Sequence, residues 1–129
     1  MKRSLDWLNQ AERDLNFAEE NLSKGYFEWV SFVSQQAAEK ATKALFYSLN
    51  IEPWGHSISK LFEELKEKID IPQEIIEVAK YLDKLYIPTR YPNGFSEGYP
   101  GNYYTKNDAE KAIKNAREII IFVKKFISK

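Results

Sequence analysis

Apolar residues near the C-terminus recur every three or four positions, and this pattern constrains the fold more than any other feature of the chain. They are Ala109, Ala112, Ile113, Ala116, Ile119, Ile120, Val123 and Phe126. This spacing places the side chains on one face of an α-helix. Thr105 and Asp108 precede it as a capping box, in which each side chain accepts from a backbone N–H of the other residue. Residues 119–123 alone would also suit a short strand, but the longer capped pattern favours a helix.

Four earlier segments show the same helical periodicity: residues 4–23, 27–50, 58–69 and 72–86. In the first, the residues expected on the buried face are Leu5, Leu8, Leu15, Ala18 and Leu22. In the second, small residues form a stripe that would let a neighbouring helix approach closely, which predicts a central position. They are Ala37, Ala38, Ala41 and Ala44. For the third, Ser57 or Ser59 is the expected N-cap.

These patterns predict an all-α fold. We expect an up-and-down antiparallel helical bundle of four long helices plus a shorter one, with a long ordered loop before the last helix. The length of 129 residues fits one domain over residues 1–129.

The charge balance and the residue types that are missing narrow the function. Lys plus Arg and Asp plus Glu both number 19, so bulk attraction to nucleic acid phosphates is not expected and DNA is not an expected ligand, although a local basic site remains open. The chain has no cysteine and one histidine, which excludes thiolate chemistry and a multi-histidine metal site within one chain. We expect no metal or other cofactor.

No segment has the length or composition of a membrane span. The longest apolar run, residues 119–123, is far shorter than the roughly 20 residues needed to cross a bilayer. The first residues lack the apolar core of a signal peptide. We expect a cytoplasmic protein without a membrane partner.

Residues 86–104 separate the last two helical segments and contain five of the eight tyrosines and three of the five prolines. Loops of this length are usually functional or disordered. Disordered segments are poor in aromatic residues. We therefore predict an ordered loop packed on the helices. Arg90 is the only cation within it.

A polar and aromatic group surrounds Arg90 and forms the candidate ligand site. Asp83 and Tyr86 are three residues apart on a predicted helix and therefore neighbours on its surface. Thr89, Arg90 and Tyr91 follow directly. The arginine fork suits phosphate or carboxylate, and tyrosines offer stacking faces with hydroxyl groups. A nucleotide or an RNA phosphate beside an aromatic ring is the ligand class that this group predicts.

Structural roles compete with this interpretation. Arg90 could form an ion pair with Asp83 or Glu97, and from the residues alone we favour that role. His56 could act in acid–base chemistry or contact a ligand, but capping or loop packing is the favoured alternative. Four polar residues before it are interpreted as ordinary helix surface and interface: Gln35, Gln36, Glu39 and Lys40.

Five segments together resemble one known family along nearly the whole chain. They are AERDLNFAEENL, GYFEWVSFVSQQAAEKATKALF, GHSISKLFEEL, YIPTRYPNG and YTKNDAEKAIKNAREII. In this order they resemble HEPN domains (higher eukaryote and prokaryote nucleotide-binding). The segments QQAAEKATKAL and YIPTRYP carry most of the resemblance.

The resemblance implies a helical bundle that is often a homodimer. Stand-alone prokaryotic members are often encoded with a minimal nucleotidyltransferase, in pairs that resemble toxin–antitoxin systems. There the HEPN chain is typically the toxin, a metal-independent ribonuclease. Its motif is an arginine followed after four to six residues by a histidine, usually at a dimer interface. The transferase can adenylylate a tyrosine near that histidine.

Arg90 matches the motif arginine, but the histidine is missing. The positions where it would stand hold Phe95, Ser96 and Glu97. Attack by a ribose 2′-hydroxyl needs a general base, which arginine cannot provide. His56 could serve only if it folds near Arg90, and a separation well beyond ~10 Å would exclude it.

Three hypotheses follow from this departure. The first is a partner of a minimal nucleotidyltransferase that binds a nucleotide or RNA phosphate around Arg90 without catalysis. The second is a ribonuclease toxin of variant chemistry that uses Arg90 with His56 or a tyrosine. The third is a purely structural dimerisation module. We expect the first.

Overall fold

The computed structural model describes residues 2–128, and every regular element within this range is helical. The helices are α1 (Lys2–Glu20), α2 (Phe27–Ser48), α3 (Ile58–Leu65), α4 (Gln73–Asp83), α5 (Pro100–Tyr103) and α6 (Lys106–Ile127). Short 3-10 turns occur at Leu22–Lys24 and Pro92–Gly94. The predicted helical bundle is confirmed.

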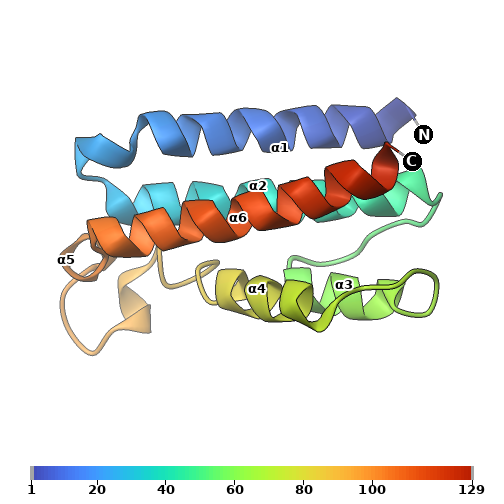
Figure 1. Cartoon of the computed structure of the whole chain (residues 1–129). Helices are drawn as coiled ribbons and strands as arrows, with labels where there is room; N and C mark the ends of the chain where they lie inside the picture. The colour runs from blue at the N-terminus through green and yellow to red at the C-terminus, as the bar shows by residue number, and fades with distance from the viewer. Residues whose placement is uncertain (1, 129) are drawn as a thin grey trace.

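The helices form a bundle in which α1, α2 and α6 run along the length of the molecule (Figure 1). α2 packs most extensively on α1 and α6. α3 and α4 lie together on the side of α2 and α6 that faces away from α1. The helix lengths differ from the prediction, because α1, α2 and α6 have 19, 22 and 22 residues whereas α4 has only 11. The shorter α3 and α4 therefore share one side of the bundle.

Local sequence signals explain where the helices begin and which faces they bury. Thr105 and Asp108 form the predicted capping box at the start of α6, and Ser57 caps α3 by accepting from the backbone N–H of Lys60. The four alanines of the small-residue stripe in α2 are fully buried, as predicted. One expectation was wrong: Leu5 is 54% exposed and Ser4 is buried instead. Adjacent residues point about 100° apart around a helix, so a buried Ser4 turns Leu5 outward.

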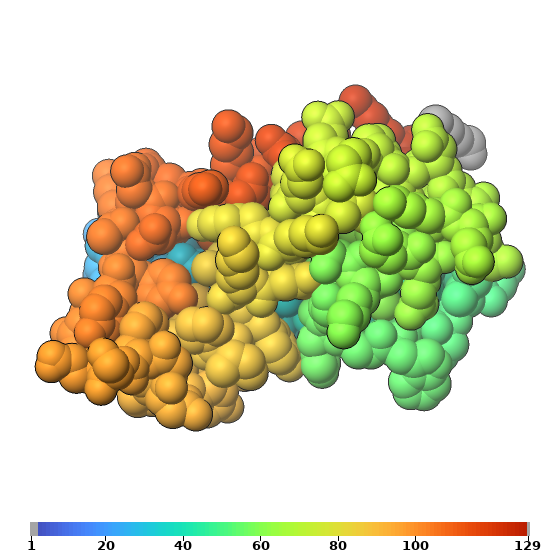
Figure 2. Space-filling view, turned by 90° about the horizontal axis from the view of Figure 1, so that it is seen from below, coloured from blue at the N-terminus to red at the C-terminus, as the bar shows by residue number. Residues whose placement is uncertain are grey.

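Residues 86–104 form an ordered loop, as predicted. The rings of Phe95 and Tyr103 stack with centroids 4.4 Å apart, and the Tyr103 hydroxyl donates to the carbonyl of Glu97 at 2.7 Å. Pro100 is buried and begins the short helix α5, which the sequence pattern did not predict. Together with α3 and α4 this loop covers most of the lower face and leaves only small areas of α2 visible (Figure 2). Within residues 2–128, no helix is long and apolar enough to span a membrane.

Candidate functional site

Arg90 lies in an aromatic cluster formed by α2 and the segment that follows α4. Its Cζ atom is 4.5 Å from the ring centroid of Phe32, 4.6 Å from that of Tyr86 and 5.1 Å from that of Tyr91. Its Nε donates to the carbonyl of Tyr86 at 2.8 Å. Cation–π contacts and this hydrogen bond hold the guanidinium in place. Phe32 was not among the predicted site residues.

The expected ion pair of Arg90 with Asp83 or Glu97 does not form. Among the ion pairs of residues 2–128, none includes Arg90. Its Nη1 and Nη2 atoms likewise have no hydrogen-bond partner in this part of the chain. The guanidinium is therefore fixed through Nε, while its two terminal nitrogens remain available to an anion.

His56 shares an aromatic partner with Arg90. The imidazole stacks on the Tyr86 ring, with centroids 5.0 Å apart and planes inclined by 19°. The Arg90 Cζ is 4.6 Å from the same Tyr86 centroid. The His56 ring centroid and the Arg90 Cζ can therefore lie no farther apart than the sum of these two distances, which is less than ~10 Å. His56 is thus not excluded by distance as a partner of Arg90.

His56 does not cap α3, because that role belongs to Ser57. Instead, His56 Nδ1 lies 2.9 Å from Oε2 of Glu39, and Lys43 Nζ lies 3.1 Å from the same oxygen. Gln35 Nε2 donates to Oε1 of Glu39 at 3.2 Å. The carboxylate of Glu39 is thus contacted by three nitrogen atoms, of which those of Lys43 and Gln35 donate to it.

Gln35 and Glu39 were interpreted as ordinary helix surface and interface. Both are buried, so the surface part of that interpretation was wrong for them. Gln35 lies three and seven positions before the buried residues Ala38 and Thr42, and Glu39 lies three positions before Thr42. Charged and amide side chains are rarely fully buried unless they are paired. This register was the available signal, and a helical projection of α2 would have placed both side chains inward.

Asp83 and Thr89 use their polar atoms within the protein. The Asp83 carboxylate accepts from the backbone N–H groups of Ile58 and Ser59, at 2.6 and 3.2 Å, and from the hydroxyls of Ser57 and Ser59, at 2.9 and 2.6 Å. Thr89 is buried and donates to the carbonyl of Leu85. Asp83 therefore anchors the turn that carries His56, and Thr89 stiffens the turn before Arg90.

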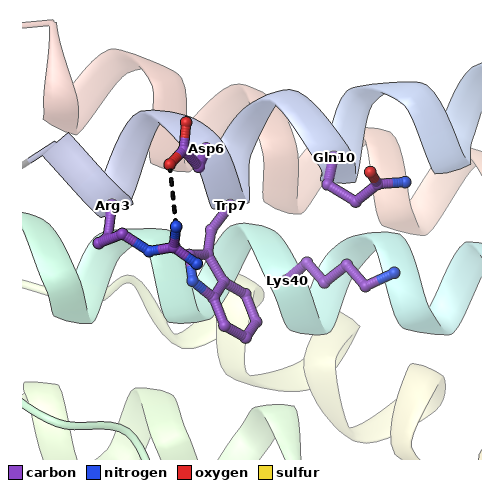
Figure 3. A pocket seen from close by; sticks show the side chains of 5 residues that line it. All are labelled: Arg3, Asp6, Trp7, Gln10 and Lys40. Atoms are coloured by element: carbon purple, nitrogen blue, oxygen red, sulfur yellow. Dashed lines mark hydrogen bonds and ion pairs between the residues drawn. The ribbon is translucent and has the colours of Figure 1, made fainter.

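A separate hollow of about 200 Å³ lies between α1 and α2 and is lined by Arg3, Asp6, Trp7, Gln10 and Lys40 (Figure 3). Its two cations are engaged by carboxylates: Arg3 pairs with Asp6 at 3.3 Å, and Lys40 pairs with Asp14 at 2.6 Å. It therefore lacks the free cation that Arg90 provides.

Within residues 2–128, no group of three or more His, Cys, Asp or Glu side chains is placed to hold a metal ion.

Comparison with known families and proteins gives consistent matches along the chain. The family described as the HEPN domain matches residues 4–126. A curated protein of Methanocaldococcus jannaschii named "Putative toxin MJ1304" is 28% identical over 130 residues, covering 94% of this chain and 86% of that protein.

Three solved structures are also similar. TT1696 from Thermus thermophilus has a TM-score of 0.93 and 43% identity, and the match covers 97% of this chain and 98% of that one. ST0689, described as an archaeal HEPN homologue, has a TM-score of 0.83 and 46% identity, with 98% and 99% covered. A HEPN domain protein from Thermotoga maritima has a TM-score of 0.79 and 34% identity, with 96% and 98% covered.

Proposed function

Because the chain belongs to the HEPN domain family, we propose that it is the toxin-like member of a pair with a minimal nucleotidyltransferase and binds an RNA or nucleotide phosphate around Arg90. The observation that carries the ligand proposal is the Arg90 guanidinium, which Tyr86 and the surrounding rings fix while its terminal nitrogens have no partner among residues 2–128. The relative named "Putative toxin MJ1304" supports the toxin-like part.

The ligand class follows from the groups around the guanidinium. Arginine binds phosphate oxygens through two parallel N–H groups. The half-exposed ring of Tyr91 offers a stacking surface for a base. Since the chain has no net charge, the local fork and rings, rather than a basic surface, would supply the affinity.

Binding of a fluorescent mixed-sequence RNA tests this proposal. Arg90→Ala should weaken binding at least about tenfold, the loss expected when a charge-assisted hydrogen bond is removed, with unchanged helicity by circular dichroism. Lys114→Ala removes an exposed cation on α6 and is the matched control, expected to bind like the wild type. Equal losses for both variants would contradict a specific role for Arg90.

A second candidate is RNA cleavage, and the geometry of His56 favours it over a purely structural role. Both Arg90 and His56 contact the Tyr86 ring. In such a reaction His56 would take the proton of a ribose 2′-hydroxyl as its oxygen attacks the adjacent phosphorus, and Arg90 would stabilise charge on the phosphate. The P–O5′ bond would break, and the leaving 5′-oxygen would take a proton from the protonated His56 or from water. Cleavage of labelled RNA without added metal, lost in both Arg90→Ala and His56→Ala, would support it. No cleavage beside an active control nuclease would leave binding as the function.

The partners are part of the same proposal. We infer a homodimer, supported by the large exposed aromatic residues Tyr26, Trp29, Trp54 and Tyr91. Analytical ultracentrifugation tests it, and a monomer at micromolar concentration would contradict it.

Co-expression with a minimal nucleotidyltransferase encoded beside the gene should give a co-migrating complex on gel filtration. An RNA ligand and such a partner would place the protein in the cytoplasm.

A further inference from the structure

We propose that Glu39 is a positioning residue that fixes the tautomer of His56, with the proton on Nδ1 and Nε2 as a free acceptor. The purpose of this acceptor rests on the proposed function, since Nε2 would accept a hydrogen bond from a hydroxyl of a bound RNA. The tautomer itself is a property of the free protein.

Glu39 forms an ion pair in the interior of the bundle. Its side chain is only 7% exposed, and Lys43 Nζ lies 3.1 Å from Oε2. In an ion pair with an ammonium group, the carboxylate is the ionised partner. An ionised carboxylate has no proton to donate. The 2.9 Å contact with His56 therefore requires the proton to be on Nδ1.

Neither the Glu39 carboxylate nor the His56 ring is free to turn. The other oxygen of Glu39 accepts from Gln35 Nε2, and Gln35 in turn accepts from Gln36 Nε2 at 2.8 Å. The imidazole plane is held by its stacking on Tyr86. Gln35, on the same helix α2, thus holds the Glu39 carboxylate, and Tyr86, in the segment after α4, holds the His56 ring.

The chemical consequence concerns the opposite nitrogen of the ring. A neutral imidazole has one donor and one acceptor nitrogen, and the hydrogen bond of one decides the role of the other. Within residues 2–128 the Nε2 atom has no hydrogen-bond partner, and 58% of the His56 side chain is exposed. A lone pair there accepts from a hydroxyl and repels an anion, so it suits a ribose 2′-hydroxyl beside the phosphate held by Arg90.

Nitrogen-15 NMR of the imidazole ring tests the tautomer directly. His56 is the only histidine, so its ring signals need no assignment against others. At alkaline pH, where an imidazole is neutral, the wild type should show a protonated Nδ1 and an unprotonated Nε2. Free imidazole side chains favour the opposite tautomer. Glu39→Ala should move the signals toward that opposite form.

Gln35→Ala is the matched control, because it removes a buried partner of the other carboxylate oxygen and leaves His56 in contact with Glu39. It should keep the wild-type tautomer. Circular dichroism checks that both variants fold, and if Glu39→Ala does not, the wild-type spectrum still decides. A wild-type ring protonated on Nε2, or a folded Glu39→Ala with unchanged ring signals, would overturn the proposal. Because no RNA is present, either result is independent of whether the protein binds RNA.

Discussion

The imidazole of His56 stacks on the ring of Tyr86, and Arg90 donates to the backbone carbonyl of that same tyrosine. His56 and Arg90 are 34 positions apart in sequence, with His56 before α3 and Arg90 after α4. Tyr86 therefore joins the cationic and the imidazole part of the candidate site.

Asp83 should contribute strongly to stability. Asp83→Ala would leave the first N–H groups of α3 and two serine hydroxyls without their acceptor. We expect a loss of about 1–3 kcal/mol in the free energy of unfolding, measured by urea denaturation. Asp83→Asn keeps an acceptor oxygen and should lose less. If Asp83→Ala were as stable as the wild type, the carboxylate would not be the anchor of this turn.

Two tyrosines outside the site should ionise late. Burial, followed by the charge of Asp108, raises the pKa of Tyr81, and the same causes in the same order raise the pKa of Tyr104. Ultraviolet titration should show a tyrosinate component above pH 10.0 that shrinks in Tyr81→Phe and in Tyr104→Phe. Asp108→Asn should bring both pKa values closer to normal.

The raised pKa values of Tyr81 and Tyr104 also make the stability of the fold depend on pH in the alkaline range. Above pH 10.0 the folded state keeps both phenols protonated while the unfolded chain loses these protons. The contribution of the two tyrosines to the free energy of unfolding is therefore complete below pH 10.0, and it is lost as the pH rises through the folded pKa values. The fall should be smaller in Tyr81→Phe, measured by urea unfolding across the alkaline range. An equally steep fall in that variant would show that Tyr81 ionises normally.

His56 should distinguish RNA from DNA if its Nε2 accepts from a 2′-hydroxyl. The wild type should bind RNA more tightly than DNA of the same sequence, by roughly 2–10-fold, the effect of one hydrogen bond. His56→Ala and Glu39→Ala should both lose this preference, mostly through weaker RNA binding, as measured by fluorescence anisotropy. Retention of the full preference in His56→Ala would assign the discrimination to another group.

Much of the fold could be predicted because helical periodicity and capping are local. The capping box and apolar spacing of α6 predict that helix from residues close together in sequence, and so does the alanine stripe of α2. Helix length was less accessible, since α4 ends at Asp83 while the apolar pattern continues to Tyr86. There the carboxylate of Asp83 turns to the start of α3, and the chain leaves the helix in a series of turns.

The site was predictable only in part. Arg90, Tyr86 and Tyr91 are close in sequence, so their proximity could be anticipated. Phe32 and Glu39 come from α2, and their approach to Arg90 and His56 depends on how the helices pack, which no local pattern specifies.

The most direct test of the proposed site uses the single histidine as a reporter while RNA is added. If RNA binds at Arg90, the ring signals of His56 should shift and saturate with the same midpoint as fluorescence anisotropy. In Arg90→Ala the midpoint should move to at least about tenfold higher RNA concentration. Saturable RNA binding by the wild type that leaves the His56 signals unmoved would place the RNA elsewhere on the protein and contradict the proposed site.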